Sequence, residues 1–270
     1  MTQGKHEQAL VILRKAATTN GLNAMEVFPE GTILVDSQSY DDEIHSITAL
    51  LSPEWRTMTL MLWATWTGLA FLYWGTIQMV TIIFFDTNSS NKSSGHVIDF
   101  DYGAIFASSC AEILGQTCVI CLIHRSQRTH ITSIMYLMGG IFVFVLCWAV
   151  AERDVPRQTL VVLSFLARGF AMGASSMTWV ITAELLPTQI RATGHSTANG
   201  VARLGGAVSP FLVNPSVDFR LIGTVMGCVS LVTSIVAWNL PETSGQTMGT
   251  AGKKQGFLDD DRPVLESEII

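Results

Sequence analysis

Long apolar runs dominate the pattern of this sequence. The longest uncharged run covers residues 57–85, between Arg56 and Asp86, and contains three tryptophans. An α-helix rises 1.5 Å per residue, so about 20 apolar residues cross the roughly 30 Å hydrocarbon core of a bilayer. This run therefore predicts a membrane-spanning helix.

Five similar runs follow, separated by short polar connections. The chain as a whole is 49% hydrophobic and only 14% charged, with a mean hydropathy of +0.38. A soluble protein of this length has too little amphipathic material to cover six such helices, so we predict an all-α membrane protein with six transmembrane helices and the lipid bilayer as its first partner. The five further runs are residues 102–123, 131–151, 159–183, 192–215 and 221–240.

Three parts of the chain are expected from this pattern. Residues 1–56 are polar and predict a cytoplasmic segment, with an amphipathic helix over residues 5–19 that stops at Asn20-Gly21. Residues 57–240 form the transmembrane bundle. Residues 241–270 lack periodicity and end acidic, so we expect a disordered cytoplasmic tail.

An even number of spans places both termini on the same side of the membrane. Two glycosylation sequons, at Asn88 and Asn91, occupy the first long connection and favour an external loop there, with both termini cytoplasmic. The positive-inside count supports this orientation weakly. The basic residues on the predicted inner side are Arg56, Arg125, Arg128, Arg191, Lys253 and Lys254.

Several function classes are disfavoured by the sequence. The net charge is −6 and no stripe of basic residues is present, which argues against nucleic-acid binding. All five cysteines fall in apolar runs, and the Cys118–Cys121 pair has no second pair to complete a zinc site. Nucleophile-elbow and phosphate-loop motifs are also missing, so we expect neither an enzyme nor a bound cofactor or metal.

Charged residues inside the spans are the strongest pointers to function. Glu112, Arg168 and Arg203 each lie within an apolar run, where a charge at the bilayer centre costs roughly 2.5–3.5 kcal/mol. Two interpretations stay open: the three residues pair for structural reasons, or they bind solute and couple its movement to ions. Glu112 is the candidate for proton coupling, since a carboxyl group can take up a proton. Trp74 and Trp179 fit either interface anchors or the wall of a cavity, and their places near span ends favour anchors.

The segment from Glu184 to Arg191 ends one span, breaks at Pro187 and begins the next span. We expect Glu184 and Arg191 to form a cytoplasmic pair that latches two helices. Arg125 and Arg128, in an earlier connection, complete a predicted cytoplasmic gating set.

Longer stretches carry a family resemblance. Residues 179–194, with Ala202-Arg203-Leu204-Gly205-Gly206, resemble the tenth and eleventh spans of the major facilitator superfamily. The sequence from Pro241 to Gly245 is similar to the Pro-Glu-Thr-x-Gly that closes many of its members. Residues 60–75 and 111–115 resemble the seventh and eighth spans of the synaptic vesicle two-related protein group. The resemblance implies that the six-helix bundle is one half of the major facilitator fold, the C-terminal half.

The resemblance also implies a function. Such transporters move a small organic solute, an organic ion or a sugar-like molecule, by alternating access between two six-span repeats, some with proton or ion coupling. An N-terminal half, from a longer form, a partner or a second copy in a homo-oligomer, is expected to complete the cavity. The plasma membrane and an intracellular vesicle both remain open as locations.

One departure from the family pattern supports an alternative. The connection from His124 to His130 lacks the aspartate and the glycine that the family carries there. A non-transporting truncated isoform or fragment, acting as a membrane-embedded binding or regulatory protein, is therefore the second hypothesis.

Overall fold

The computed structural model describes residues 6–29, 32, 47–86, 99–123, 125–152 and 154–243. The chain divides into two compact units, Met1–Ile44 and His45–Ile270. In the first unit, α1 (His6–Thr19) confirms the helix expected near the N-terminus, and α2 (Ala24–Val27) follows it. The turn after α1 contains Gly21 at a φ of +76°, a left-handed conformation that glycine adopts without a Cβ penalty.

The second unit contains six long helices that match the six predicted spans to within four residues at each end. Five of them, α4, α5, α6, α7 and α9, are long and apolar enough to cross a membrane. The other, α8, has a comparable length but a more polar amino-acid composition. The six are α4 (Arg56–Ile83), α5 (Tyr102–Leu122), α6 (Arg128–Ala151), α7 (Arg157–Leu185), α8 (Thr188–Leu212) and α9 (Phe219–Trp238).

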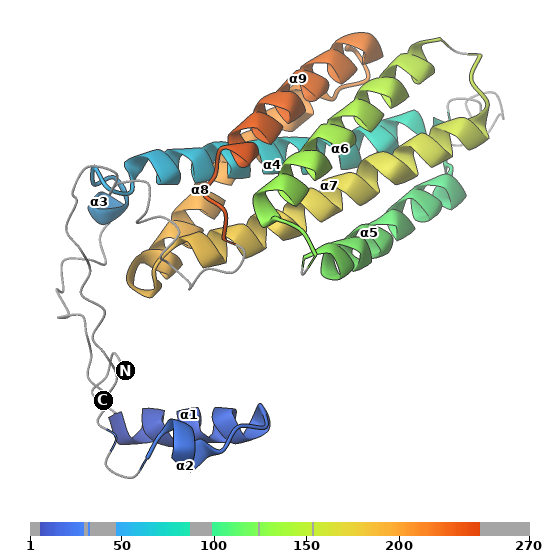
Figure 1. Ribbon diagram of the computed structural model, residues 1–270. Helices are drawn as coiled ribbons and strands as arrows, with labels where there is room; N and C mark the ends of the chain where they lie inside the picture. The colour runs from blue at the N-terminus through green and yellow to red at the C-terminus, as the bar shows by residue number, and fades with distance from the viewer. Residues whose placement is uncertain are drawn as a thin grey trace. The chain divides into compact units, whose positions relative to one another are not determined.

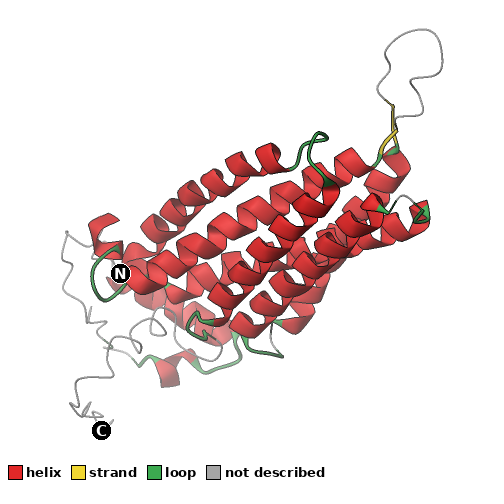
Figure 2. Cartoon of the chain, turned by 90° about the horizontal axis from the view of Figure 1, so that it is seen from above, coloured by secondary structure: helices red, strands yellow, loops and turns green. Residues whose placement is uncertain are grey.

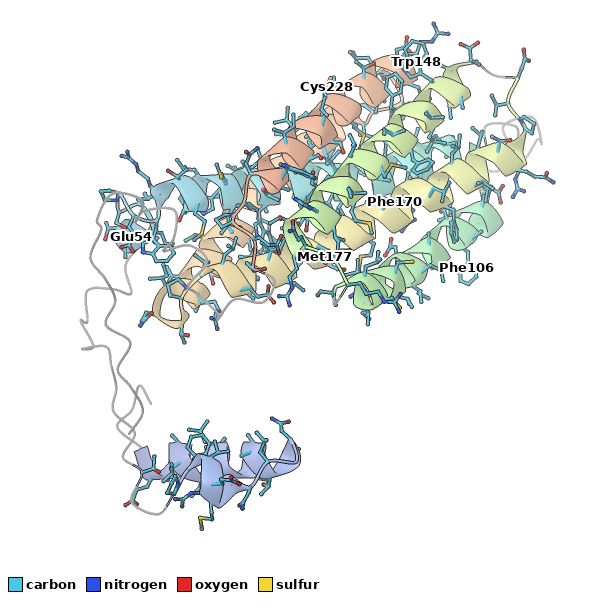
Figure 3. All side chains as sticks on the ribbon, viewed as in Figure 1. Glu54, Phe106, Trp148, Phe170, Met177 and Cys228 are labelled. Carbon is cyan, nitrogen blue, oxygen red and sulfur yellow. The ribbon has the colours of Figure 1, made fainter. Side chains whose placement is uncertain are left out.

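The long helices run side by side (Figures 1 and 2). Helix α4 packs against α7, α8 and α9, while α6 packs between α7 and α9, and α5 packs on α7. Trp66 of α4 and Met177 of α7 are almost fully buried in this core. Figure 3 shows Met177 among the helices and Phe106 on the outer side of α5, where 72% of Phe106 is exposed. An outer face this apolar suits lipid or a second repeat rather than water.

Glycines set the closest helix contacts, as the small residues in spans lead one to expect. A Cβ on Gly205 of α8 would overlap the backbone carbonyl oxygen of Thr67 in α4. A Cβ on Gly115 of α5 would overlap the carbonyl of Gly169 in α7 in the same way. These two positions bring the backbones of their helix pairs into direct contact.

The folded unit extends past both predicted boundaries of the bundle. The short helix α3 (Ile47–Leu50) precedes α4, and its last residue, Leu50, is completely buried. The Leu50 carbonyl accepts a hydrogen bond of 2.9 Å from the Thr59 hydroxyl. After α9, Thr243 is only 5% exposed. Short polar segments on both sides of residues 57–240 therefore pack against helix ends, although they show no periodicity in the sequence. Residues 244–270 lie outside the described residues.

A two-residue strand pairing lies between the end of α4 and the start of α5. Strand β1 (Phe85–Asp86) pairs antiparallel with β2 (Asp99–Phe100). Asp101 then caps α5, accepting a hydrogen bond of 3.1 Å from the Ala104 amide. That amide lowers the pKa of the Asp101 carboxyl, and the paired guanidinium of Arg157 lowers it further.

Candidate functional site

An ion pair joins α5 and α7 inside the bundle. The Arg168 guanidinium donates to the Glu112 carboxylate, and the Tyr73 hydroxyl of α4 donates to the same carboxylate at 3.4 Å. The Arg168 side chain is 10% exposed and that of Glu112 is 25% exposed. The structure thus brings together two of the three charged residues singled out in the sequence.

Close packing explains why this pair forms. Gly115 lies one turn after Glu112 and meets Gly169, the residue that follows Arg168. The backbones of α5 and α7 approach closely at that point, so the two long side chains beside it reach each other. A second polar contact follows, one turn further along α5 and two turns further along α7, in which the Ser176 hydroxyl donates to the side-chain oxygen of Gln116. Polar side chains therefore mark a line between α5 and α7.

A cavity of about 690 Å³ lies beside this pair, between α4, α7 and α8. Its wall includes four aromatic residues, one of which is Tyr73. Trp66 and Trp179 meet edge to face with ring centroids 4.9 Å apart, and Trp74 is half exposed. The Trp66 indole donates a hydrogen bond of 2.9 Å to the Thr182 hydroxyl, which fixes that ring. The structure places Trp74 and Trp179 in the cavity lining, on helical faces that turn towards α8.

Polar groups also face this cavity. Arg203 of α8 is exposed in the cavity lining, and in the described part of the chain no carboxylate pairs with it. Arg203 therefore does not join Glu112 and Arg168. Gln78 and Asn199 line the same cavity and were missed from sequence. The signal was present, because Gln78 follows Trp74 by four residues and Asn199 precedes Arg203 by four, and such spacing places residues on one helical face.

A second polar cluster lies at the C-terminal end of α7. Glu184 forms an ion pair with Arg128 of α6 and accepts a hydrogen bond of 2.7 Å from the Thr243 hydroxyl. Glu184 forms an ion pair at this end, but its partner is Arg128 and not the Arg191 expected from the sequence. The Arg191 side chain instead donates at 3.1 Å to the Leu186 carbonyl at the turn between α7 and α8. The intervening proline turn leaves Arg191 beside the backbone of that turn rather than beside Glu184.

The segment after α9 completes this cluster. The Glu242 carboxylate accepts hydrogen bonds from the Arg128 amide at 2.9 Å and the Thr129 amide at 3.2 Å, and so caps α6. The Glu242 carboxylate, from the end of the unit, thus binds at the connection between α5 and α6, which lacks the aspartate that the family carries there. Arg125 is exposed and takes no part in the cluster, while His124, Asn88 and Asn91 lie outside the described residues.

Comparison with known proteins places the chain in a family. The family model described as sugar (and other) transporter matches residues 1–252. The chain belongs to this family. It is 29% identical over 262 residues to svop-1 of Caenorhabditis elegans, covering 92% of this chain and 48% of that protein. It is 28% identical over 269 residues to the synaptic vesicle 2-related protein of Xenopus laevis, covering 93% and 47%.

A third relative bears a transporter name. The organic cation/carnitine transporter 2 of Homo sapiens is 27% identical over 252 residues, covering 91% of this chain and 41% of that protein. The chain therefore spans about half the length of the curated relatives it matches. The expected resemblance to major facilitator transporters of the synaptic vesicle two-related type is confirmed, as is a multi-pass membrane protein whose relatives are transporters and not enzymes.

Proposed function

We propose that this chain is the C-terminal half of a transporter that moves a small organic solute, an organic ion or a sugar-like molecule, by alternating access. The cavity between α4, α7 and α8 carries the proposal, because it combines aromatic surfaces with Arg203 and Gln78. The side-chain oxygen of Gln78 is buried and has no hydrogen-bond partner among the described residues. Rotation of the Gln78 side chain would expose this oxygen to a solute that donates a hydrogen bond.

A second six-helix repeat would close this cavity. Trp74 and Trp179 are 49% and 46% exposed, although both are large apolar residues at the site. In transporters built from two repeats the solute binds between the repeats. The longer relatives are consistent with this arrangement, whether the other repeat comes from the same chain, from a partner or from a second copy.

Glu112 and Arg168 are proposed to couple the solute to an ion. Protonation of Glu112 would release Arg168, so the pair offers two states that differ by one proton. At the other end, Glu184, Arg128 and Arg191 are proposed to hold the cytoplasmic gate. This places both termini in the cytoplasm and Asn88 and Asn91 in an external, glycosylated loop.

Uptake into proteoliposomes tests the proposal. The form with both repeats is reconstituted and offered labelled carnitine, tetraethylammonium, an aromatic organic anion and glucose at several pH values. We expect saturable uptake of at least one solute and a pH dependence that Glu112→Gln abolishes. Gln78→Leu should raise KM with little change in expression, because it removes a cavity acceptor and leaves the ion pair intact.

Two results would contradict parts of the proposal. Uptake with unchanged pH dependence in Glu112→Gln would exclude Glu112 as the coupling group. Absence of specific uptake with every solute, together with normal binding of membrane partners, would favour the non-transporting alternative.

Glycosidase treatment of the chain from eukaryotic cells tests orientation separately: a mobility shift that Asn88→Gln and Asn91→Gln remove supports the external loop.

A further inference from the structure

A groove lies between α5 and α6 at the end of the bundle where their connection runs. Both helices pack on α7 rather than chiefly on each other, and the space between them measures about 690 Å³. Its lining is divided by chemistry. Arg125, Gln127 and His130 provide polar groups at the connection, and Leu122, Ile131 and Ile134 provide an aliphatic wall along the helices.

The positive charge at the mouth of the groove is not neutralised by the neighbouring cluster. Glu184 and Glu242 bind Arg128 and the first amides of α6. Arg125 is exposed and has no carboxylate partner in the described ranges. His130 is held in place by stacking on Trp238 of α9, with ring centroids 4.1 Å apart. A guanidinium and an imidazole are therefore both available to an anion.

The aliphatic wall indicates that the ligand also has an apolar part. Ile134 is 52% exposed and Leu122 is 37% exposed, and both lie within helices that span the membrane. A soluble anion would leave this wall uncovered. A phospholipid covers it with an acyl chain while its phosphate stays at the level of the connection, where basic groups attract anionic headgroups.

We propose that this groove is a binding site for an anionic phospholipid. The phosphate binds Arg125 and His130, and one acyl chain lies along Leu122, Ile131 and Ile134. The site is separate from the solute cavity between α4, α7 and α8, so it stands whether or not the chain transports solute. The lipid would add contacts between α5 and α6, two helices that pack mainly on other helices.

Native mass spectrometry of the full chain in a neutral detergent tests the site. Phosphatidylglycerol and phosphatidylcholine with identical acyl chains are titrated separately, with and without excess inorganic phosphate. We expect retention of phosphatidylglycerol over phosphatidylcholine by about fivefold or more, and Arg125→Gln should reduce that preference about fivefold. Arg220→Gln is the matched control, because Arg220 is also exposed but lies at the end of α9 opposite to Trp238. This substitution should leave the preference for phosphatidylglycerol unchanged.

Three outcomes would overturn the proposal. They are equal retention of the two lipids, an unaltered preference in Arg125→Gln, and full displacement of the lipid by inorganic phosphate, which would indicate a site for a soluble anion. A second measurement needs no variant. Phosphatidylglycerol with a photoreactive acyl chain should label residues 131–135, and labelling spread evenly over the outer helix faces would contradict a specific groove.

Discussion

Neutralising Glu112 should destabilise the bundle more than neutralising its partner. In Glu112→Gln the Arg168 guanidinium keeps its charge inside the bundle, where its side chain is only 10% exposed. In Arg168→Gln the remaining charge is Glu112, which is 25% exposed and can take up a proton. The two single substitutions therefore leave different residual charges, and the deeper charge is the costlier one.

The stability lost in each variant depends on how deeply the remaining charge is buried. Removing one partner of a fully buried ion pair costs about 3–5 kcal/mol, so partial exposure of Glu112 reduces the expected cost of Glu112→Gln to about 2–3 kcal/mol. For Arg168→Gln we expect about 1–2 kcal/mol. The double variant leaves no unpaired charge and should fall within about 1 kcal/mol of the original protein.

Thermal unfolding in detergent, followed by tryptophan fluorescence at one fixed scan rate, measures these differences. At roughly 2–4 °C per kcal/mol for a chain of this size, Glu112→Gln should lower the apparent midpoint by about 4–12 °C. Arg157→Gln is the matched control. It breaks the exposed pair with Asp101, in which the arginine side chain is 62% exposed, and should cost less than about 1 kcal/mol.

The reasoning fails if the double variant is as unstable as the sum of its two single variants. Additive losses would mean that Glu112 and Arg168 stabilise the fold through separate contacts and not as a pair. A loss in Glu112→Gln no larger than that in Arg157→Gln would show that water reaches Arg168 freely.

Three further results are expected from other parts of the structure. Gly205→Leu should cost about 3 kcal/mol or prevent folding, because its Cβ meets a backbone carbonyl of α4; Gly200→Leu, where nothing lies within 4 Å, is the control in the same melting assay. Glu242→Gln should lower stability by about 1–2 kcal/mol through a weaker cap on α6, measured as the same midpoint. Asp101 has a folded pKa below its usual 3.8, so its contribution is complete above that value and is lost as pH falls through the lowered one. Asp101→Asn should therefore flatten the acid side of a plot of midpoint against pH, and an unchanged acid side would exclude this cap as its cause.

The charged cluster at the end of α7 shows how far sequence reasoning reached. Glu184 was expected to take part in a latch, and its proline turn located the end of the span. Its actual partner, Arg128, is 56 positions earlier, and no spacing rule relates residues so far apart. The role of Glu242 was hidden for the same reason, because its segment is short and polar and takes its structure from the helix end that it caps.

The sequence by itself determined where the membrane helices begin and end. In lipid each backbone group must be bonded within its own helix, so an apolar run of bilayer length can adopt only one structure, and that constraint is local. Which helix faces meet is decided by packing across the whole bundle. Only the tertiary structure therefore placed Glu112 beside Arg168, turned Trp74 and Trp179 towards a shared cavity, and left Arg203 and Arg125 without carboxylate partners among the described residues.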